Sequence, residues 1–235
     1  MKLSTKRAIA TLLAVLVGGS ILASPASALD RYISVSATGS VKVVPDTVRV
    51  NASVAVVASA NATALSGASA SASKLWAALS KSGIESKYVK STNLSVYPEY
   101  NYTADKGSTL VGYRASQSFE IIIRSAKNAG VVLDAAIAAV DNSLSIDGVT
   151  PFVYDNTSAT SSARADAVAR AKGKATSYAK LLGVSLGKIT YLEESSGANN
   201  YPVVMAMAKS DAGATQIDLG QQDVTISVNT RWAIA

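Results

Sequence analysis

A two-residue alternation of apolar and polar side chains, recurring in several short segments, limits most strongly what this chain can fold into. From Thr47 to Val57 every second residue is valine or alanine, and most residues between them are polar. A period of two is typical of a strand with one buried face. A similar segment, Ile33 to Val43, precedes it, with Pro45 and Asp46 between the two. This order predicts a hairpin over residues 33–57.

Alternation returns later in the chain. Residues 94–102 and 119–123 alternate on either side of the turn-rich segment from Ala104 to Ser108, which predicts a second hairpin. Further strands are expected at 144–153, at 188–193 and in the last part of the chain, where alternate residues from Val224 to Trp232 form one apolar face.

Three segments have apolar residues at helical spacing instead. They cover Asn61 to Ser82, the residues around 132–140, and about 158–182, and Gly83 has the position of a helix C-cap. Gly173, inside the third helix, favours close packing against a neighbouring element. The buried face expected for the third helix consists of Val168, Ala171, Ala175, Tyr178, Ala179 and Leu182.

This order of elements predicts an α+β fold. Hairpins are frequent and each helix is followed by a strand, which favours a largely antiparallel sheet, or sheets, with the three helices packed on one face. No internal repeat recurs at a fixed period. The chain is expected to form a single domain or two packed subdomains, with an exposed loop over residues 195–222, a segment rich in Gly, Asn, Ala and Gln.

The first 28 residues have the pattern of a cleaved signal peptide. Lys2, Lys6 and Arg7 precede the apolar run Ala8 to Ala23, and the small residues of Ala26-Ser27-Ala28 suit signal peptidase. The alternative is a membrane anchor, but the run has 16 residues, whereas a span needs about 20. We therefore expect cleavage after Ala28, a mature domain of residues 29–235 without a stable membrane anchor, and export to the periplasm or the exterior.

Charge limits the expected partners. The three basic residues of the signal peptide leave 19 basic against 16 acidic residues in the mature chain, a net charge of +3. This excess is too mild to indicate nucleic acid as a partner, and export argues against it as well.

Composition restricts the possible chemistry. The chain contains no cysteine and no histidine, which excludes Ser-His-Asp and Cys-His catalytic units and zinc sites of Cys and His ligands. The motifs Ser71-x-x-Lys74 and Ser177-x-x-Lys180 match a Ser/Lys hydrolase pattern, but both lie in Ala-rich helical segments without accompanying elements. We expect no catalytic residues, no metal ligands and no cofactor-binding residues, and a Ser/Lys hydrolase is an alternative.

Four tyrosines lie around the second predicted hairpin: Tyr97, Tyr100, Tyr102 and Tyr113. Amphipathic rings suit recognition, so these residues are candidate contacts with a partner or a second copy. Cross-strand pairing of the rings is the simpler interpretation. A module that binds glycans or the cell wall through these tyrosines is another alternative.

Several of these segments together resemble a known family. The order and spacing are those of the SIMPL domain family, formerly DUF541, across nearly the whole mature chain. The residues that carry the resemblance are Ile33-x-Val35-x3-Gly39-x-Val41-x-Val43-x-Pro45-Asp46-x-Val48, Gly83-Ile84, Tyr97-Pro98-x-Tyr100, Gly112-Tyr113-x-Ala115 and Ala163-Arg164-x2-Ala167-x3-Ala171-x2-Lys174-Ala175-x3-Ala179-x2-Leu182-Gly183-x3-Gly187. Leu219 stands where the family usually has a proline, and Arg170 and Gly173 replace a common acid and alanine.

The resemblance implies an exported, often periplasmic α+β protein that self-associates, is linked to oxidative or envelope stress, and has no accepted catalytic site or cofactor. The resulting hypothesis is a non-enzymatic protein that forms homo-oligomers outside the cytoplasm, with an envelope component as a further candidate partner. Any protective action would proceed without thiol chemistry, because the chain has no cysteine.

Overall fold

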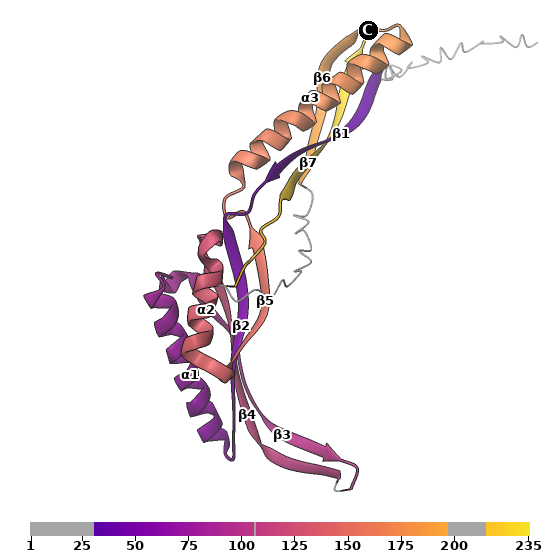
Figure 1. Ribbon diagram of the computed structural model, residues 1–235. Coiled ribbons are helices and arrows are strands. Elements are labelled where there is room, and N and C mark those ends of the chain that lie inside the picture. The colour runs from indigo at the N-terminus through magenta and orange to yellow at the C-terminus, as the bar shows by residue number, and fades with distance from the viewer. Residues whose placement is uncertain (1–30, 106, 197–214) are drawn as a thin grey trace, which may run out of the picture. The chain divides into compact units, whose positions relative to one another are not determined.

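The computed structural model describes residues 31–105, 107–196 and 215–235, which contain two antiparallel sheets and three α-helices (Figure 1). The α+β class, the antiparallel pairing and the three helices predicted from the sequence are confirmed. Short 3-10 helices follow or precede the longer elements at Ser86–Tyr88 (η1), Ala126–Asn128 (η2) and Asp141–Ser143 (η3). Within the described residues, no helix is both long and apolar enough to cross a membrane.

One sheet has three strands in the order β1-β7-β6, with one long helix, α3, on one of its faces (Figure 1). The core between them is built on a stripe of six buried alanines, one at every fourth helix position, so that successive alanines lie about one turn apart on the same face. The stripe consists of Ala159, Ala163, Ala167, Ala171, Ala175 and Ala179. The elements are β1 (Tyr32–Val43), β7 (Gln222–Ile234), β6 (Leu186–Ser196) and α3 (Thr157–Leu182).

The small side chains let α3 lie very close to β1. A Cβ atom added to Gly39 would lie 2.2 Å from the carbonyl oxygen of Ala163 and 2.3 Å from the backbone nitrogen of Ala167. No side chain fits at position 39 unless the helix moves, so the glycine and the alanine stripe together set the distance between helix and sheet.

The other sheet has four strands in the order β3-β4-β2-β5, and α1 and α2 pack into a common core with it. Trp76 of α1 meets Phe119 of β4 edge to face, with 6.5 Å between the ring centroids. The elements are β3 (Val89–Thr103), β4 (Gly107–Ile123), β2 (Thr47–Ala58), β5 (Leu144–Phe152), α1 (Asn61–Lys81) and α2 (Ala129–Val140).

The strand pairing confirms one predicted hairpin and corrects the other. β3 and β4 form the hairpin expected around residues 94–123. The prediction of a hairpin over residues 33–57 is wrong, because β1 pairs with β7 whereas β2 pairs with β4 and β5. The alternating pattern identifies a half-buried strand, but Val44 to Asp46 connect strands of different sheets, and the pattern contains no information about the partner.

The third helix also differs from its predicted face. The sequence predicts Tyr178 and Leu182 in the core, but they are 50% and 64% exposed, and Val168 is only partly buried. The prediction of close packing at Gly173 is wrong as well, because a Cβ atom added there would meet no atom of a neighbouring element within 4 Å. The strict four-residue alanine spacing, and not the largest apolar residues, determines which face of α3 is buried.

Two expectations concern residues outside the described part of the chain. The signal peptide, residues 1–28, and its cleavage after Ala28 lie there entirely. Most of the predicted loop 195–222 does too, since residues 197–214 are not described. Of the remainder, residues 215–221 form no helix or strand, and Ser195 and Ser196 end β6.

Residues 215–221 are fixed to the four-stranded sheet's core by α2. The backbone N–H and the hydroxyl of Thr215 donate hydrogen bonds to the carboxylate of Asp134, and Ile217 and Leu219 pack against the core. The two hydrogen bonds lower the pKa of Asp134 below its ordinary value of 3.8. A lowered pKa means that the carboxylate stabilises the fold above pH 3.8, and that this contribution is lost as the pH falls through the folded-state pKa.

We therefore expect Asp134→Asn to lower the free energy of unfolding at pH 7 and to have a smaller effect near pH 3. Urea unfolding followed by circular dichroism at the two pH values measures both effects. The matched control is Asp147→Asn, which changes an exposed aspartate of β5. An Asp134→Asn effect that is the same at both pH values, or absent at pH 7, would contradict this interpretation of the contact.

Two helices end differently. Gly83 follows α1 with φ of +81°, and the backbone N–H of Ile84 donates to the carbonyl oxygen of Leu79 at 3.0 Å, which confirms the predicted glycine cap. Asp141 ends α2 with φ of +58° and ψ of −142°, and it is the single non-glycine residue with positive φ among the described residues. That region is strained for any residue with a Cβ atom.

Asp141→Gly is expected to raise the free energy of unfolding by about 1 kcal/mol, because relief of the strain exceeds the entropy that glycine adds to the unfolded chain. Denaturant unfolding compares it with Asp141→Asn, which removes the charge and keeps the Cβ atom. Equal stabilisation by both variants would show that charge, and not backbone strain, is the cause.

Candidate functional site

The hairpin of β3 and β4 continues beyond the rest of its sheet (Figure 1). Pairing of β2 with β4 stops at Ala58 opposite Tyr113, whereas pairing of β3 with β4 continues to Thr103 opposite Gly107. We call residues 99–112 the hairpin tip. No third strand pairs with the described residues of the tip, and α1 begins only at Asn61, after β2 has ended.

Large apolar side chains cover the hairpin tip. Tyr100 is 53% exposed and Tyr102 is 80% exposed, and on β4 Leu110 and Val111 are also more than half exposed. Exposed contiguous apolar patches of this kind are typical of interaction sites.

The apolar face of the tip continues a face that α1 covers. Tyr100 lies opposite Leu110, and two residues back along β3 Pro98 lies opposite Tyr113. Tyr113 packs against a small cluster that contains Ala64 of α1 and Ala115 of β4. Because alternate residues of a strand share a face, Tyr100 and Leu110 lie on the face that the helix covers further along.

An ion pair supports the base of the tip on the opposite face. The guanidinium of Arg114 donates a hydrogen bond to Glu99 at 2.7 Å, and this contact raises the pKa of Arg114. The pairing register shifts by one residue between Glu99 and Tyr100, which leaves Val111 as the extra residue of a β-bulge. A bulge twists a strand pair and changes the direction in which the following side chains point.

The four predicted tyrosines fall into different environments. Tyr97, Tyr100 and Tyr102 are exposed on β3, with Tyr97 on the face opposite to Tyr100. Tyr113 is half-buried against α1, so the structure does not group it with the others. Their role as partner contacts stays a prediction. Leu110 and Val111 were not identified as candidate contacts from the sequence. The feature that could have indicated them is an apolar pair that lies beside a turn, between the polar residues Ser108 and Thr109 and the glycine at position 112.

A second exposed apolar surface lies at the end of α3. Tyr178, Leu181 and Leu182 are spaced three and four residues apart, which places them on one side of the helix. All three are at least half exposed. We call these residues the α3 end surface, and it is separate from the buried alanine stripe.

The Ser/Lys motifs do not form a site in the structure. Ser71 is buried in α1 whereas Lys74 is exposed, and no hydrogen bond joins Ser71 to Lys74 or Ser177 to Lys180 in the described residues. The ranges of the chain that the structure covers also contain no group of three acidic residues that could hold a metal ion.

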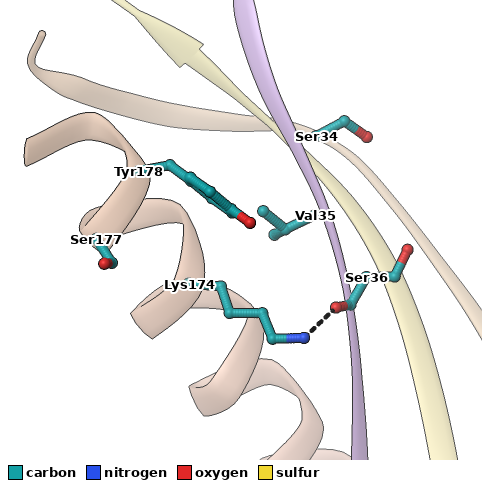
Figure 2. Close-up of a pocket in the computed structure, with 6 residues that line it drawn as sticks. All are labelled: Ser34, Val35, Ser36, Lys174, Ser177 and Tyr178. Atoms are coloured by element: carbon teal, nitrogen blue, oxygen red, sulfur yellow. Dashed lines mark hydrogen bonds between the residues drawn. The ribbon is translucent and has the colours of Figure 1, made fainter. Parts of the chain in front are cut away.

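Ser177 instead lines a shallow pocket of about 380 Å³ between α3 and β1, together with Lys174 and Tyr178 (Figure 2). The Lys174 ammonium donates a hydrogen bond to the backbone carbonyl of Ser36 at 2.9 Å. Asp166, two turns earlier in α3, accepts a hydrogen bond from the backbone N–H of Ser40 at 3.3 Å. β1 is an edge strand, so these two side chains cover backbone groups that could otherwise pair with another strand.

Comparison with known proteins identifies relatives over most of the chain. The SIMPL family model, described as "Protein of unknown function (DUF541)", matches residues 33–232. The 26 kDa periplasmic immunogenic protein of Brucella melitensis biotype 1 is 28% identical over 215 residues, which cover 86% of this chain and 84% of the relative. The "Uncharacterized protein YggE" of Escherichia coli K12 is 32% identical over 176 residues, covering 73% of this chain and 71% of the relative.

Proposed function

The chain belongs to the SIMPL (DUF541) family, and from this premise we propose that it is an exported protein that associates with copies of itself in the cell envelope and acts by assembly, not by catalysis. The observation that carries the proposal is the hairpin tip, where Tyr100, Tyr102 and Leu110 are exposed and no element of the described part of the chain covers them. Protection of the envelope, including under oxidative stress, is the role proposed for the assembly.

A second copy of the chain is the proposed occupant of the hairpin tip. The same chain carries another exposed apolar surface, the α3 end surface, on a different sheet's helix. Contact between the tip of one copy and the α3 end surface of the next would remove both surfaces from water. Such a contact joins two different patches, so it is head-to-tail and leads to a ring or a filament.

Export is supported by two independent observations. The first 28 residues have a basic start, an apolar run and a small-residue cleavage motif. The relative from Brucella melitensis is named as a periplasmic protein.

The proposal of a non-enzymatic role rests on chemistry. The whole chain lacks cysteine and histidine, and among the described residues neither Ser71 and Lys74 nor Ser177 and Lys180 are joined by a hydrogen bond. A lysine that acts as a base must lie within hydrogen-bond reach of the serine hydroxyl whose proton it accepts.

Sedimentation velocity on residues 29–235 tests the proposed self-association. We expect species larger than a monomer, whose share increases with protein concentration in the micromolar range. A single monomeric species at high micromolar concentration would contradict the proposal. Binding of the monomer to isolated cell wall would then favour the glycan-binding alternative.

A further inference from the structure

A second pocket lies on the four-stranded sheet, where the ends of α1 and β4 meet η1 and the beginning of α2. Its volume is about 450 Å³, within the range of roughly 300–1,000 Å³ that is usual for small-molecule sites. Its wall contains apolar side chains, among them Ile84 and Val132, and polar ones, among them Ser125 and Asn128. This combination suits a small ligand with one polar end and one apolar part.

Arg124 lies in the wall of this pocket, and two aromatic rings hold its side chain. The guanidinium carbon is 3.4 Å from the centroid of the Tyr154 ring and 5.8 Å from that of Tyr88. One guanidinium nitrogen also donates a hydrogen bond to the Tyr88 hydroxyl at 3.3 Å. Stacking of this kind fixes the plane of a guanidinium while leaving most of its N–H donors available.

The charges around Tyr88 leave Arg124 without a counter-ion. The Lys87 ammonium lies 4.9 Å from the centroid of the Tyr88 ring and 2.9 Å from the Glu85 carboxylate. This ion pair raises the pKa of Lys87, and it gives the Glu85 carboxylate a partner other than Arg124. Among the described residues, no carboxylate lies within 4.0 Å of the Arg124 guanidinium. Glu85 also lines the pocket, but its carboxylate is paired with Lys87, so Arg124 is the charged residue of the pocket wall that has no ion-pair partner among the described residues.

We propose that this pocket binds the carboxylate of a small organic acid, with Arg124 as the group that receives it. A planar guanidinium forms two parallel hydrogen bonds with a carboxylate, an arrangement that matches its fork of donors. Ser125 and Asn128 offer further polar groups, and the apolar wall at Ile84 and Val132 would receive an aliphatic part of the ligand. The carboxylate can come from a free acid or from the C-terminus of a peptide. The inference does not depend on self-association.

Isothermal titration of residues 29–235 tests the pocket with four probes: acetate, N-acetyl-Ala-Ala with a free C-terminus, its C-terminal amide, and inorganic phosphate. We expect saturable binding of a carboxylate probe, with the amide weaker by about tenfold or more. Binding of acetate alone identifies a free acid as the ligand, whereas tighter binding of the peptide acid identifies a peptide C-terminus.

Arg124→Gln should weaken carboxylate binding by about tenfold or more, and Arg124→Lys, which keeps the charge and loses the fork, should have an intermediate effect. The matched control is Arg231→Gln. Arg231 is likewise held between two tyrosines, 5.1 Å from the Tyr32 centroid and 5.2 Å from that of Tyr191, but outside the pocket.

Three results would overturn the inference: no saturable binding of either carboxylate probe by the wild-type chain, equal binding of the acid and its amide, or phosphate binding tighter than carboxylate binding. The acid-amide comparison uses the wild-type chain, so it remains decisive if an Arg124 variant fails to fold. A carboxylate affinity that Arg124→Gln and Arg231→Gln lower equally would also contradict the assignment.

Discussion

Replacing Gly39 with alanine is expected to lower the free energy of unfolding by about 3 kcal/mol, although the change adds a single methyl group. The added Cβ would lie 2.2 Å from the Ala163 carbonyl oxygen and 2.3 Å from the Ala167 nitrogen. Both are backbone atoms, so no side chain can turn aside and α3 must move as a whole. Moving α3 would loosen the entire alanine core of the three-stranded sheet.

Gly173→Ala is the matched control, because it makes the same chemical change in α3 itself. Position 173 is exposed and has open space where the Cβ would lie, so alanine should raise stability by about 1 kcal/mol through its helix propensity. Urea unfolding of both variants measures the two changes. A Gly39→Ala variant as stable as the wild type would show that α3 does not lie as close to β1 as described.

The largest effect on association is expected from the hairpin tip. Combining Tyr100→Ser with Leu110→Ser should weaken self-association by about a hundredfold or more, because each large apolar side chain removed from water contributes about 1.5–3 kcal/mol. Both side chains are more than half exposed in the single chain, so the double variant should remain folded. Sedimentation equilibrium gives the association constant, and circular dichroism verifies the fold.

Val131→Ser is the control for the tip variant. Val131 is 62% exposed on α2, away from both surfaces proposed for the contact, so its replacement should leave the association constant unchanged. Equal loss of association in the control and the tip variant would show that any added serine on the surface weakens association, and it would contradict a specific role of the hairpin tip.

Local sequence pattern predicted most of the elements and few of the contacts between them. The alternation in residues 47–57 is a property of the strand's two faces, and it correctly indicated β2. It could not indicate that β2 pairs with β4 and β5, since partner choice depends on residues far away in the chain. The same limit explains the error for the hairpin over residues 33–57.

The third helix shows a different limit. Large apolar residues at helical spacing usually lie on the buried face of a helix, and the sequence therefore predicts that Tyr178 and Leu182 are buried. In α3 the buried face consists of alanines, because Gly39 brings the backbones too close for anything larger. The buried face of α3 can be recognised only when Gly39 and the alanine stripe are considered together, and these two features lie more than 100 residues apart in the sequence.

Some residues of the candidate sites could be predicted from local sequence, and others depend on tertiary structure. Tyr100 and Tyr102 could be predicted from their position beside a turn, whereas the half-buried state of Tyr113 depends on α1. The Arg124 pocket could not be predicted from local pattern, because Tyr88, Arg124 and Tyr154 come from three separate segments. Tertiary structure alone brings the two rings to the guanidinium.

Mixing two defective variants tests the head-to-tail assembly most directly. One carries Tyr100→Ser and Leu110→Ser in the hairpin tip, and the other carries Leu181→Ser and Leu182→Ser in the α3 end surface. Each should be monomeric alone in sedimentation velocity. A 1:1 mixture should form a dimer and nothing larger, because each variant keeps the surface that the other lacks. A mixture that stays monomeric, or a variant that still assembles alone, would contradict the proposed contact.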